Sequence, residues 1–538
     1  MLGASESLSR QAMRLLGQLP GPLEAYVTMS DWLNPSRAID SAWRHLPKWL
    51  SDLDQFKPAR NDLPRQRILV YSVLPSHVDY SLALSIVLIA RGAAIDFAWS
   101  PYPTYYFETP PTIGYLYWLR SMRRIVPRIS HPYLKLIDLD TVEPCPATDA
   151  MREVAALQAR MDASYVLLRE RTHIDTDPTD QRAYEFRLAR NLEAVTKVAR
   201  LLNTNRYNRV FVVNGAILEF GAVFGYVARQ GLPTVTLEVG PGNVMVANGR
   251  SVMNMDTSDM WKRDEPHILS DERRMRVHGL IERRQQPATK GVTLDEFQLA
   301  AVTPAEQTRA QLGLRPDLPV VLICPNVPFD AAYFVEGKRC FSFMSEWLTK
   351  TVRHLAGRND CQVVVRSHPA EPYYRTSETT VSLIREILPN LPAHVQVIPP
   401  EFPVSTYAIM EIADLGVVYW STTGLEMAMR GLPVVCGVPA LYYNSKGFTL
   451  DPATPEEYFA HIDRIIRNPH AHRLTPRQVE LAWCYADMFF HRWWRPFPWR
   501  AGAELWRDLK AWPMARMWSP EGEEKFGGVF RALLGEST

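Results

Sequence analysis

The segment from residue 417 to residue 437, VVYWSTTGLEMAMRGLPVVCG, constrains the possible folds of this chain more than any other. Its first four residues are apolar and predict a buried strand, and a short helix is expected over 425–430. Gly431 ends that helix, and Pro433 opens the next apolar strand. Because a helix separates the two strands, we expect them to lie parallel in a sheet that helices cover.

This alternation of short apolar strands with helices occurs twice along the chain. The first set of predicted strands comprises residues 68–73, 95–99, 210–213 and 234–237. The second set comprises residues 320–323, 363–365, 395–398, 415–418 and 434–435. Helices are expected over 80–91 and in the polar stretch 146–203. The sequence therefore predicts an α/β chain with two Rossmann-like, doubly wound parallel sheets.

The domain boundaries follow from shifts in composition along the 538 residues. A polar stretch with Pro and Gly, residues 282–300, is the predicted linker between the two sheets. We expect the carboxyl ends of both sheets to face a cleft, the usual ligand position in such folds. The predicted parts are a helical N-terminal extension, a first and a second Rossmann-like domain, and a C-terminal helical segment that packs on the first domain, at 1–60, 61–290, 291–480 and 481–538.

Composition excludes several classes of protein. Lys and Arg total 60 against 58 acidic residues, and this balance argues against bulk nucleic-acid binding. The six cysteines are scattered, with no CxxC pair and no metal-ligand spacing. The first twenty residues lack the apolar core of a signal peptide, and the longest apolar stretch, Leu82 to Ala90, is too short to cross a bilayer. We therefore expect a cytoplasmic protein.

Tryptophan and arginine alternate through the C-terminal segment. Two interpretations remain open. The segment packs back on the first domain, with arginine stems covering apolar surface, or it forms an aromatic and basic surface for membrane headgroups or a carbohydrate acceptor. We favour the first, and the second would place the protein at the inner face of the membrane. The tryptophans are Trp483, Trp493, Trp494, Trp499, Trp506, Trp512 and Trp518.

A hydroxyl-rich turn, Ser421-Thr422-Thr423-Gly424, lies between the predicted strand and helix of the opening segment. Free N–H groups and hydroxyls at a helix N-terminus suit a phosphate. Glu426, one turn further on, could accept hydrogen bonds from sugar hydroxyls. The alternatives are that the hydroxyls only cap the helix and that Glu426 only complements its dipole.

A second polar loop, Arg366-Ser367-His368-Pro369, follows the predicted strand 363–365. A histidine at this position could donate a hydrogen bond to a phosphate oxygen, and Arg366 would add positive charge. The alternative is a histidine whose hydrogen bonds are satisfied within the loop. Together with the hydroxyl-rich turn, this loop favours a nucleotide-sugar site.

Three motifs make this interpretation more specific. RSHPAEP, YWSTTGLEMAMRGLPVVCGVPALYYNSKGFT and PATPEEYFAHI resemble the capsular-polysaccharide biosynthesis glycosyltransferase-like family, which is related to bacterial Kdo-type capsule transferases and has a GT-B fold. The resemblance covers mainly residues 318–465, with a weaker part at 208–262. Non-hydrolysing nucleotide-sugar epimerases carry a similar turn. The resemblance implies donor binding by His368, Ser421, Thr422, Thr423 and Glu426.

The weaker part of the resemblance concerns two loops of the first domain. Asn214-Gly215-Ala216 and Glu238-Val239-Gly240 look like the family's Asn-Gly-Arg and Glu-x-Gly loops, although Ala216 replaces the arginine. Glu238 is either a general base for an acceptor hydroxyl or a structural carboxylate. His77, oriented by Asp79, is a second candidate for the base, and Asp79 is otherwise an early-helix acid.

Two pairs of aspartates have the DxD spacing of metal-dependent transferases, 52–54 and 138–140, but their context differs, and we expect no essential metal and no cofactor. The sequence thus predicts a metal-independent GT-B glycosyltransferase of surface or capsular polysaccharide biosynthesis. It would move a sugar from a nucleotide-sugar donor to a glycan or lipid-linked acceptor. The alternatives are a nucleotide-sugar 2-epimerase of the same fold and a non-catalytic polysaccharide assembly protein.

Overall fold

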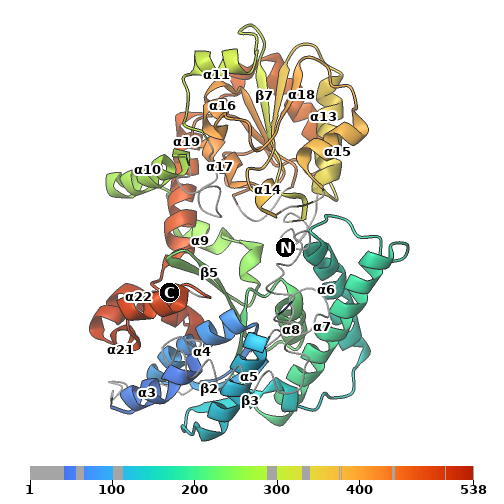
Figure 1. The fold of residues 1–538 in the computed structure, drawn as a ribbon. Coiled ribbons are helices and arrows are strands. Elements are labelled where there is room, and N and C mark those ends of the chain that lie inside the picture. The colour runs from blue at the N-terminus through green and yellow to red at the C-terminus, as the bar shows by residue number, and fades with distance from the viewer. Residues whose placement is uncertain are drawn as a thin grey trace. The chain divides into compact units, whose positions relative to one another are not determined.

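The computed structural model describes residues 12, 42–55, 66–100, 113–287, 300–329, 340–374, 376, 378–438, 443–502 and 504–536. The chain forms two compact units (Figure 1). Unit 1 contains Leu167–Thr172 and Asn254–Trp493, and unit 2 contains Ala4–Val166, His173–Met253 and Trp494–Thr538. Of the predicted N-terminal extension, only residue 12 and the helix α3 (Ala42–Gln55) are described, and the rest lies outside the described residues.

Unit 2 is built on a seven-stranded sheet with the order β12-β6-β5-β4-β1-β2-β3. The strands from β1 to β5 pair in parallel, whereas β6 and β12 add an antiparallel edge. The strands are β1 (Arg67–Val73), β2 (Ala94–Ser100), β3 (Leu134–Asp138), β4 (Arg209–Val213), β5 (Thr234–Gly240), β6 (Asn243–Asn248) and β12 (Arg495–Pro496).

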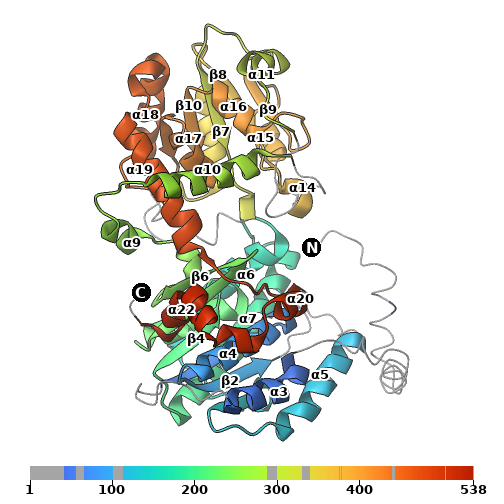
Figure 2. The same ribbon diagram turned by 90° about the vertical axis from the view of Figure 1, so that its left-hand side faces the viewer.

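Helices cover both faces of this sheet, which explains why its central strands are apolar almost throughout. Figure 1 shows α3 and α4 on one face and α7 and α8 on the other, and Figure 2 looks toward the face that the C-terminal helices also cover. The helices of unit 2 after α3 are α4 (Pro75–Ala90), α5 (Ile113–Ile125), α6 (Asp149–Leu167), α7 (Pro178–Thr204), α8 (Leu218–Arg229), α20 (Glu504–Ala511), α21 (Met514–Met517) and α22 (Pro520–Leu534).

Unit 1 is built on a five-stranded parallel sheet with the order β11-β10-β7-β8-β9. Its strands are β7 (Val320–Cys324), β8 (Gln362–Arg366), β9 (Val395–Ile398), β10 (Leu415–Val418) and β11 (Val434–Cys436). Figure 1 shows α13, α15 and α18 on one side of this sheet and α11 and α16 on the other. The helices around the sheet are α11 (Ala305–Gln311), α13 (Met344–Ala356), α14 (Glu371–Tyr374), α15 (Thr380–Ile387), α16 (Thr406–Ile412), α17 (Thr422–Ala428) and α18 (Pro455–Arg467).

Three further helices belong to unit 1: α9 (Ser258–Arg263), α10 (Asp271–Gln285) and α19 (Pro476–Asp487), and the last continues as a π-helical segment over 488–493. The fully buried Asp487 carboxylate of α19 ties α19 to α10, because it pairs with Arg273 at 2.8 Å and Arg276 at 2.7 Å, both on α10, and also with Arg492 at 3.2 Å. The chain passes from one compact unit to the other near residues 253 and 493 and at the short segment Leu167–Thr172, whereas the sequence places boundaries near 290 and 480.

The predicted fold class, an α/β chain with two doubly wound sheets, is confirmed, and the predicted central strands lie within a residue or two of the observed ones. Two local predictions need correction. The helix α4 begins at Pro75 and not at residue 80. Glu238 lies inside β5, which continues to Gly240 because it pairs antiparallel with β6, and not in a loop.

In each sheet, the later strands are added first on one side of the first strand and then on the other. In unit 1, β8 and β9 extend the sheet from one side of β7, and β10 and β11 extend it from the other. In unit 2, β2 and β3 lie on one side of β1 and β4 and β5 on the other. Successive crossovers then run on opposite faces and leave a crevice at the carboxyl ends of the central strands. The reversal lies between β7 and β10 in unit 1 and between β1 and β4 in unit 2.

The C-terminal segment from Trp494 forms part of unit 2, where Arg495 and Pro496 pair with β6. Its tryptophans are buried or half-buried, and its arginines bind neighbouring carboxylates or carbonyls, as in the pair of Arg500 with Asp508 at 2.6 Å. The tryptophans therefore do not form the exposed aromatic surface of the second interpretation. Within the ranges that the structure describes, every helix is too short or too polar to span a bilayer.

Trp499 gives a direct test of this assignment. Its side chain is fully buried, and its indole N–H donates to the carbonyl of Trp512 at 2.9 Å. We expect Trp499→Ala to reduce the free energy of unfolding by about 3–5 kcal/mol, because it leaves a large cavity. Calorimetry would record this as a lower unfolding temperature, and the half-buried Trp506→Ala is the control with a smaller effect. An unchanged unfolding temperature in Trp499→Ala would contradict the assignment.

Candidate functional site

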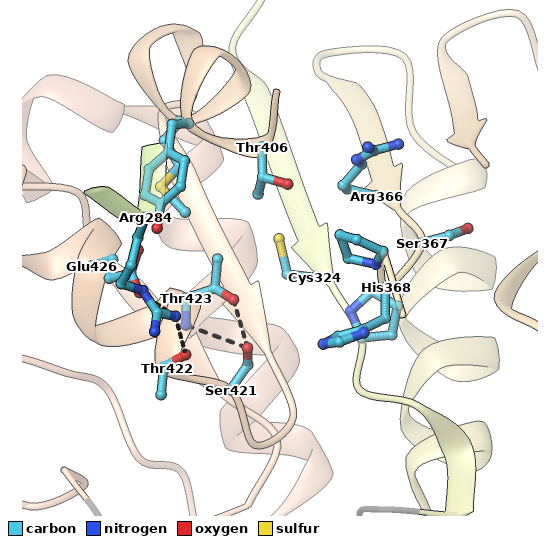
Figure 3. Close-up of a pocket in the computed structure, with 14 residues that line it drawn as sticks. Arg284, Cys324, Arg366, Ser367, His368, Thr406, Ser421, Thr422, Thr423 and Glu426 are labelled. Atoms are coloured by element: carbon cyan, nitrogen blue, oxygen red, sulfur yellow. Dashed lines mark hydrogen bonds and ion pairs between the residues drawn. The ribbon is translucent and has the colours of Figure 1, made fainter. Parts of the chain in front are cut away.

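A pocket of unit 1 opens at the crevice between β7 and β10 (Figure 3). Fourteen residues line it, and they come from the carboxyl ends of β7, β8 and β10, from α16 and α17, and from the end of α10. Figure 3 shows the residues of α17 and Arg284 on one side and those of the 366–368 loop on the other. The pocket thus brings together the hydroxyl-rich turn and the Arg366-Ser367-His368-Pro369 loop, which the sequence places about fifty residues apart.

Hydroxyl groups form one wall of the pocket. Ser421 caps α17, and its Oγ accepts from the Thr423 N–H at 3.3 Å and lies 2.5 Å from Thr423 Oγ1. Thr422 begins the helix and turns its hydroxyl toward Arg284, at 3.5 Å. Because α17 has only seven residues, its dipole is a weak anion attractor, and the polar character of this wall comes mainly from the hydroxyls. The capping alternative holds for Ser421, and all three residues also line the pocket.

Gly424 lies behind this wall and does not line the pocket. A Cβ at this position would lie 2.4 Å from the Tyr443 hydroxyl and 2.9 Å from a methyl of Val418. The Tyr443 hydroxyl donates to the Ser421 carbonyl at 2.7 Å and so fixes the start of α17. Gly424 is therefore needed for close packing of the turn and is not a ligand-contacting side chain.

Glu426 is buried at the base of the same wall. Its carboxylate lies 3.1 Å from the Arg284 guanidinium, which reaches the pocket from α10. Burial, followed by the Glu426 charge, raises the pKa of the neighbouring Tyr407 hydroxyl above its usual range. Glu426 is 1% exposed, pairs with Arg284 and also lines the pocket, so its contact with sugar hydroxyls stays a prediction.

Arg366 has a different role from the predicted one. Its guanidinium donates to the carbonyl of Pro399 at 2.5 Å and to that of Pro400 at 3.3 Å, and the residue is 3% exposed. These bonds tie the end of β8 to the chain after β9. Arg366 therefore lines the pocket, but both of its terminal guanidinium nitrogens donate to the backbone. The guanidinium of Arg284, 27% exposed, is the better placed to bind an anion.

His368 enters the pocket as a neutral donor. The Ala370 N–H donates to Nδ1 of His368 at 3.1 Å, so that Nε2 carries the proton in the neutral ring. Burial, and secondly the charge of Arg366, lowers the pKa of His368 to about 4. Burial also raises the pKa of the Cys324 thiol nearby to about 12, which leaves it protonated. The pocket thus offers N–H and O–H donors and one guanidinium from α10 to a ligand.

The candidates in the first domain lie near the carboxyl ends of β4 and β5 in unit 2. Asn214 follows β4 and donates through Nδ2 to Glu238 Oε2 at 2.5 Å. Both Asn214 and Gly215 have positive φ, 61° and 77°, and a Cβ on Gly215 would lie 2.6 Å from a methyl of Thr236. Burial raises the pKa of Glu238 above its ordinary value, although the Asn214 bond opposes this shift. Glu238 is therefore a stronger base than an exposed carboxylate.

His77 and Asp79 do not form the predicted pair. Both lie in the first turns of α4, and side chains two positions apart on a helix do not face each other. Asp79 accepts from the Ala42 N–H at 3.2 Å and so caps α3. Burial lowers the pKa of His77, whose ring lies 5.7 Å from that of Phe220, to about 4. A histidine with this pKa is a weak base at neutral pH, so Glu238 is the stronger candidate.

The aspartate pairs with DxD spacing are engaged elsewhere. Asp138 and Asp140 bind Arg123 at 3.0 Å and 2.7 Å, and Asp52 binds Lys48 at 2.8 Å. Among the residues that the structure describes, no group of three or more His, Cys, Asp or Glu side chains is arranged to hold a metal ion.

Arg284 is the site residue that sequence reasoning missed. It lies at the end of α10, inside the stretch 282–300 that was predicted to be a linker, and that helix carries five arginines. No local signal separates Arg284 from the exposed Arg283 beside it. Its position depends on the packing of α10 against α19 through Asp487, which the sequence does not encode locally.

Comparisons with known proteins give no family. No protein-family model and no curated protein matches the sequence. Among solved structures, a Thermosulfurimonas dismutans KpsC, a beta Kdo 2,4 transferase, is 14% identical with a TM-score of 0.31, over 52% of this chain and 79% of that chain. Sucrose-phosphate synthase from Thermosynechococcus elongatus is 15% identical with a TM-score of 0.29, over 88% of this chain and all of that one.

A third similar structure is the UDP-GlcNAc 2-epimerase from Neisseria meningitidis bound to UDP-GlcNAc. It is 10% identical with a TM-score of 0.25, over 79% of this chain and 98% of that chain. These structures include transferases and an epimerase, and at such identities and TM-scores they do not select between the two. The functional assignment therefore rests on the site.

The lowered pKa of His368 predicts how stability depends on pH. Between the ordinary value of 6.5 and about 4, the unfolded chain takes up a proton that the folded imidazole does not. We therefore expect stability to fall as the pH falls through this window, and His368→Asn to reduce the slope of unfolding temperature against pH. The exposed His470→Asn is the control, and an equal reduction in both variants would contradict the assignment.

Proposed function

We propose that the chain is a metal-independent glycosyltransferase that holds a nucleotide-sugar donor in the pocket of unit 1. The observation that carries this proposal is the convergence of Arg284, the Nε2–H of His368 and the hydroxyls of Ser421 and Thr422 at a strand-order reversal. A cation and several neutral donors suit a phosphate, and this crevice is where α/β sheets bind ligands. The three motifs that resemble capsule transferases support the same assignment.

The same groups would stabilise the departing phosphate. When the bond from the anomeric carbon to the phosphate oxygen breaks, negative charge grows on that oxygen. Fixed donors aimed at this charge lower the barrier, and here they would take the place of a metal ion. The donor pocket therefore serves both binding and leaving-group stabilisation.

Glu238 of unit 2 is the proposed general base. It would take the proton of an acceptor hydroxyl while that oxygen forms its bond to the anomeric carbon. The raised pKa of Glu238 favours this role, and Asn214 holds the carboxylate in place. The resemblance to capsule transferases points to a glycan or lipid-linked acceptor.

Binding of nucleotides tests the donor site. We expect Arg284→Gln to weaken binding about tenfold to a hundredfold, since a hydrogen bond to a charged group contributes about 1.5–3 kcal/mol. Calorimetric titration with CMP, UDP and GDP in the presence of EDTA would measure this. The matched control is the neighbouring exposed residue, Arg283→Gln. Equal affinity in the two variants would contradict the assignment of Arg284 to the donor site.

Turnover tests the proposed base. We expect Glu238→Gln to reduce kcat about a hundredfold to ten thousandfold while the donor still binds. Because the base must be ionised, wild-type activity should fall on acidification through a pKa higher than that of an ordinary carboxylate. Glu185→Gln, an exposed change on α7, is the control. Unchanged kcat in Glu238→Gln would remove Glu238 from the mechanism, and a 2-epimer of the donor sugar as the product would favour the epimerase.

A further inference from the structure

A network of buried charges links α6, α7 and α8 of unit 2. Asp162 on α6, Arg187 and Asn191 on α7, and Glu219 on α8 are all at most 2% exposed. Arg187 donates to Asp162 at 3.3 Å and to Glu219 at 2.8 Å, and Asn191 donates to Asp162 at 2.8 Å. A protein in which apolar side chains replace such a buried ionic network is often at least as stable. The network therefore suggests a role in fixing one geometry.

This network holds the turn that follows β4. The second oxygen of Asp162 accepts from the Leu218 N–H at 2.8 Å and from Gln158 at 2.8 Å, and Gln158 also donates to the Ala216 carbonyl at 2.9 Å. Asn214 and Leu218, at the two ends of the turn, have φ of 61° and 53°. Left-handed backbone is costly for residues with a side chain and persists only where its surroundings enforce it.

The turn over residues 214–218 also fixes the carboxylate of Glu238. Asn214 Oδ1 accepts from the Ala216 N–H at 3.0 Å, and its Nδ2 is thereby directed to Glu238. The Asn214 carbonyl accepts from Ser251 Oγ at 3.0 Å on the other side. A continuous series of hydrogen bonds therefore runs from Gln158 through Ala216 and Asn214 to Glu238.

We propose that Gln158 and Asp162 are positioning residues for Glu238: they hold the 214–218 turn so that Asn214 donates to the Glu238 carboxylate. This inference rests on the proposed function, because it assigns Glu238 to the base. Neither residue touches a substrate. The series of bonds also stabilises the ionised form of Glu238, because the Asn214 hydrogen bond lowers the pKa of its carboxyl group.

The test uses Gln158→Met in the full chain, which removes both donated hydrogen bonds at similar volume and leaves the ion pairs of Arg187 intact. The readout is the release of nucleotide from CMP-, UDP- and GDP-activated sugars, with water as the acceptor. We expect kcat to fall about tenfold to a hundredfold, as for a misplaced catalytic group, with donor affinity unchanged. The acid limb of the pH–rate profile should move to higher pH, because the carboxylate loses a donor.

Tyr80 on α4 is a titratable group whose pKa is affected by burial and, secondly, by the Glu238 charge. Burial raises the pKa of its hydroxyl well above 10, so it stays neutral over this range and does not produce the limb. The matched control is Asp96→Asn, a carboxylate of unit 2 that is 3% exposed and binds Arg67 and Tyr207, each at 2.8 Å. It should lower the unfolding temperature without moving the limb.

If the network is merely structural, Gln158→Met and Asp96→Asn should both lose stability equally, and Gln158→Met should leave kcat and the acid limb of the pH–rate profile unchanged. That result would overturn the inference. If the wild-type chain releases no nucleotide, that outcome contradicts the proposed function and leaves the inference open to a structural test. A crystal structure of Gln158→Met provides that test. Loss of the contact between Asn214 and Glu238 supports the inference. Retention of that contact at hydrogen-bond distance overturns it.

Discussion

The reversal of strand order in each sheet is the constraint on which both candidate sites depend. The first strand of each unit, β1 or β7, lies in the interior of its sheet, and later strands are added first on one side and then on the other. The connections that follow two neighbouring strands run to opposite faces of the sheet at this point, and they leave the space between the strand ends open. In unit 1 this space holds the hydroxyls of α17 and the 366–368 loop. In unit 2, Asn214 follows β4 at the reversal and donates to Glu238 on the neighbouring β5.

The polar groups of unit 1 form two sets, those that bond to the protein backbone and those that face the pocket. Arg366 satisfies backbone carbonyls, and its charge helps to keep His368 neutral. A neutral imidazole with its proton on Nε2 donates without the desolvation cost of a buried cation. Positive charge reaches the pocket from outside the sheet, through Arg284, which the buried Glu426 orients. This division explains how a phosphate could be held without a metal ion.

The sequence predicts those features that depend on local pattern. Strands covered by helices on both faces are continuous apolar runs, and polar residues at their carboxyl ends mark the crevice, as at Ser421 and His368. The antiparallel β6, with the sequence NVMVAN, was missed because its direction is set by its neighbour β5. The roles of Arg366 and Arg284 depend on carbonyls and helices distant in the sequence, so no local pattern distinguishes them from other arginines.

The most direct test of the donor site is a crystal structure of the protein with CMP, UDP or GDP, grown in EDTA. The account predicts a nucleotide in the pocket of unit 1, with its phosphate in contact with the Arg284 guanidinium and with Nε2 of His368. It also predicts that the Ser421 or Thr422 hydroxyl donates to the same phosphate. A nucleotide bound elsewhere, or one that binds only when a divalent metal ion is supplied, would contradict the account.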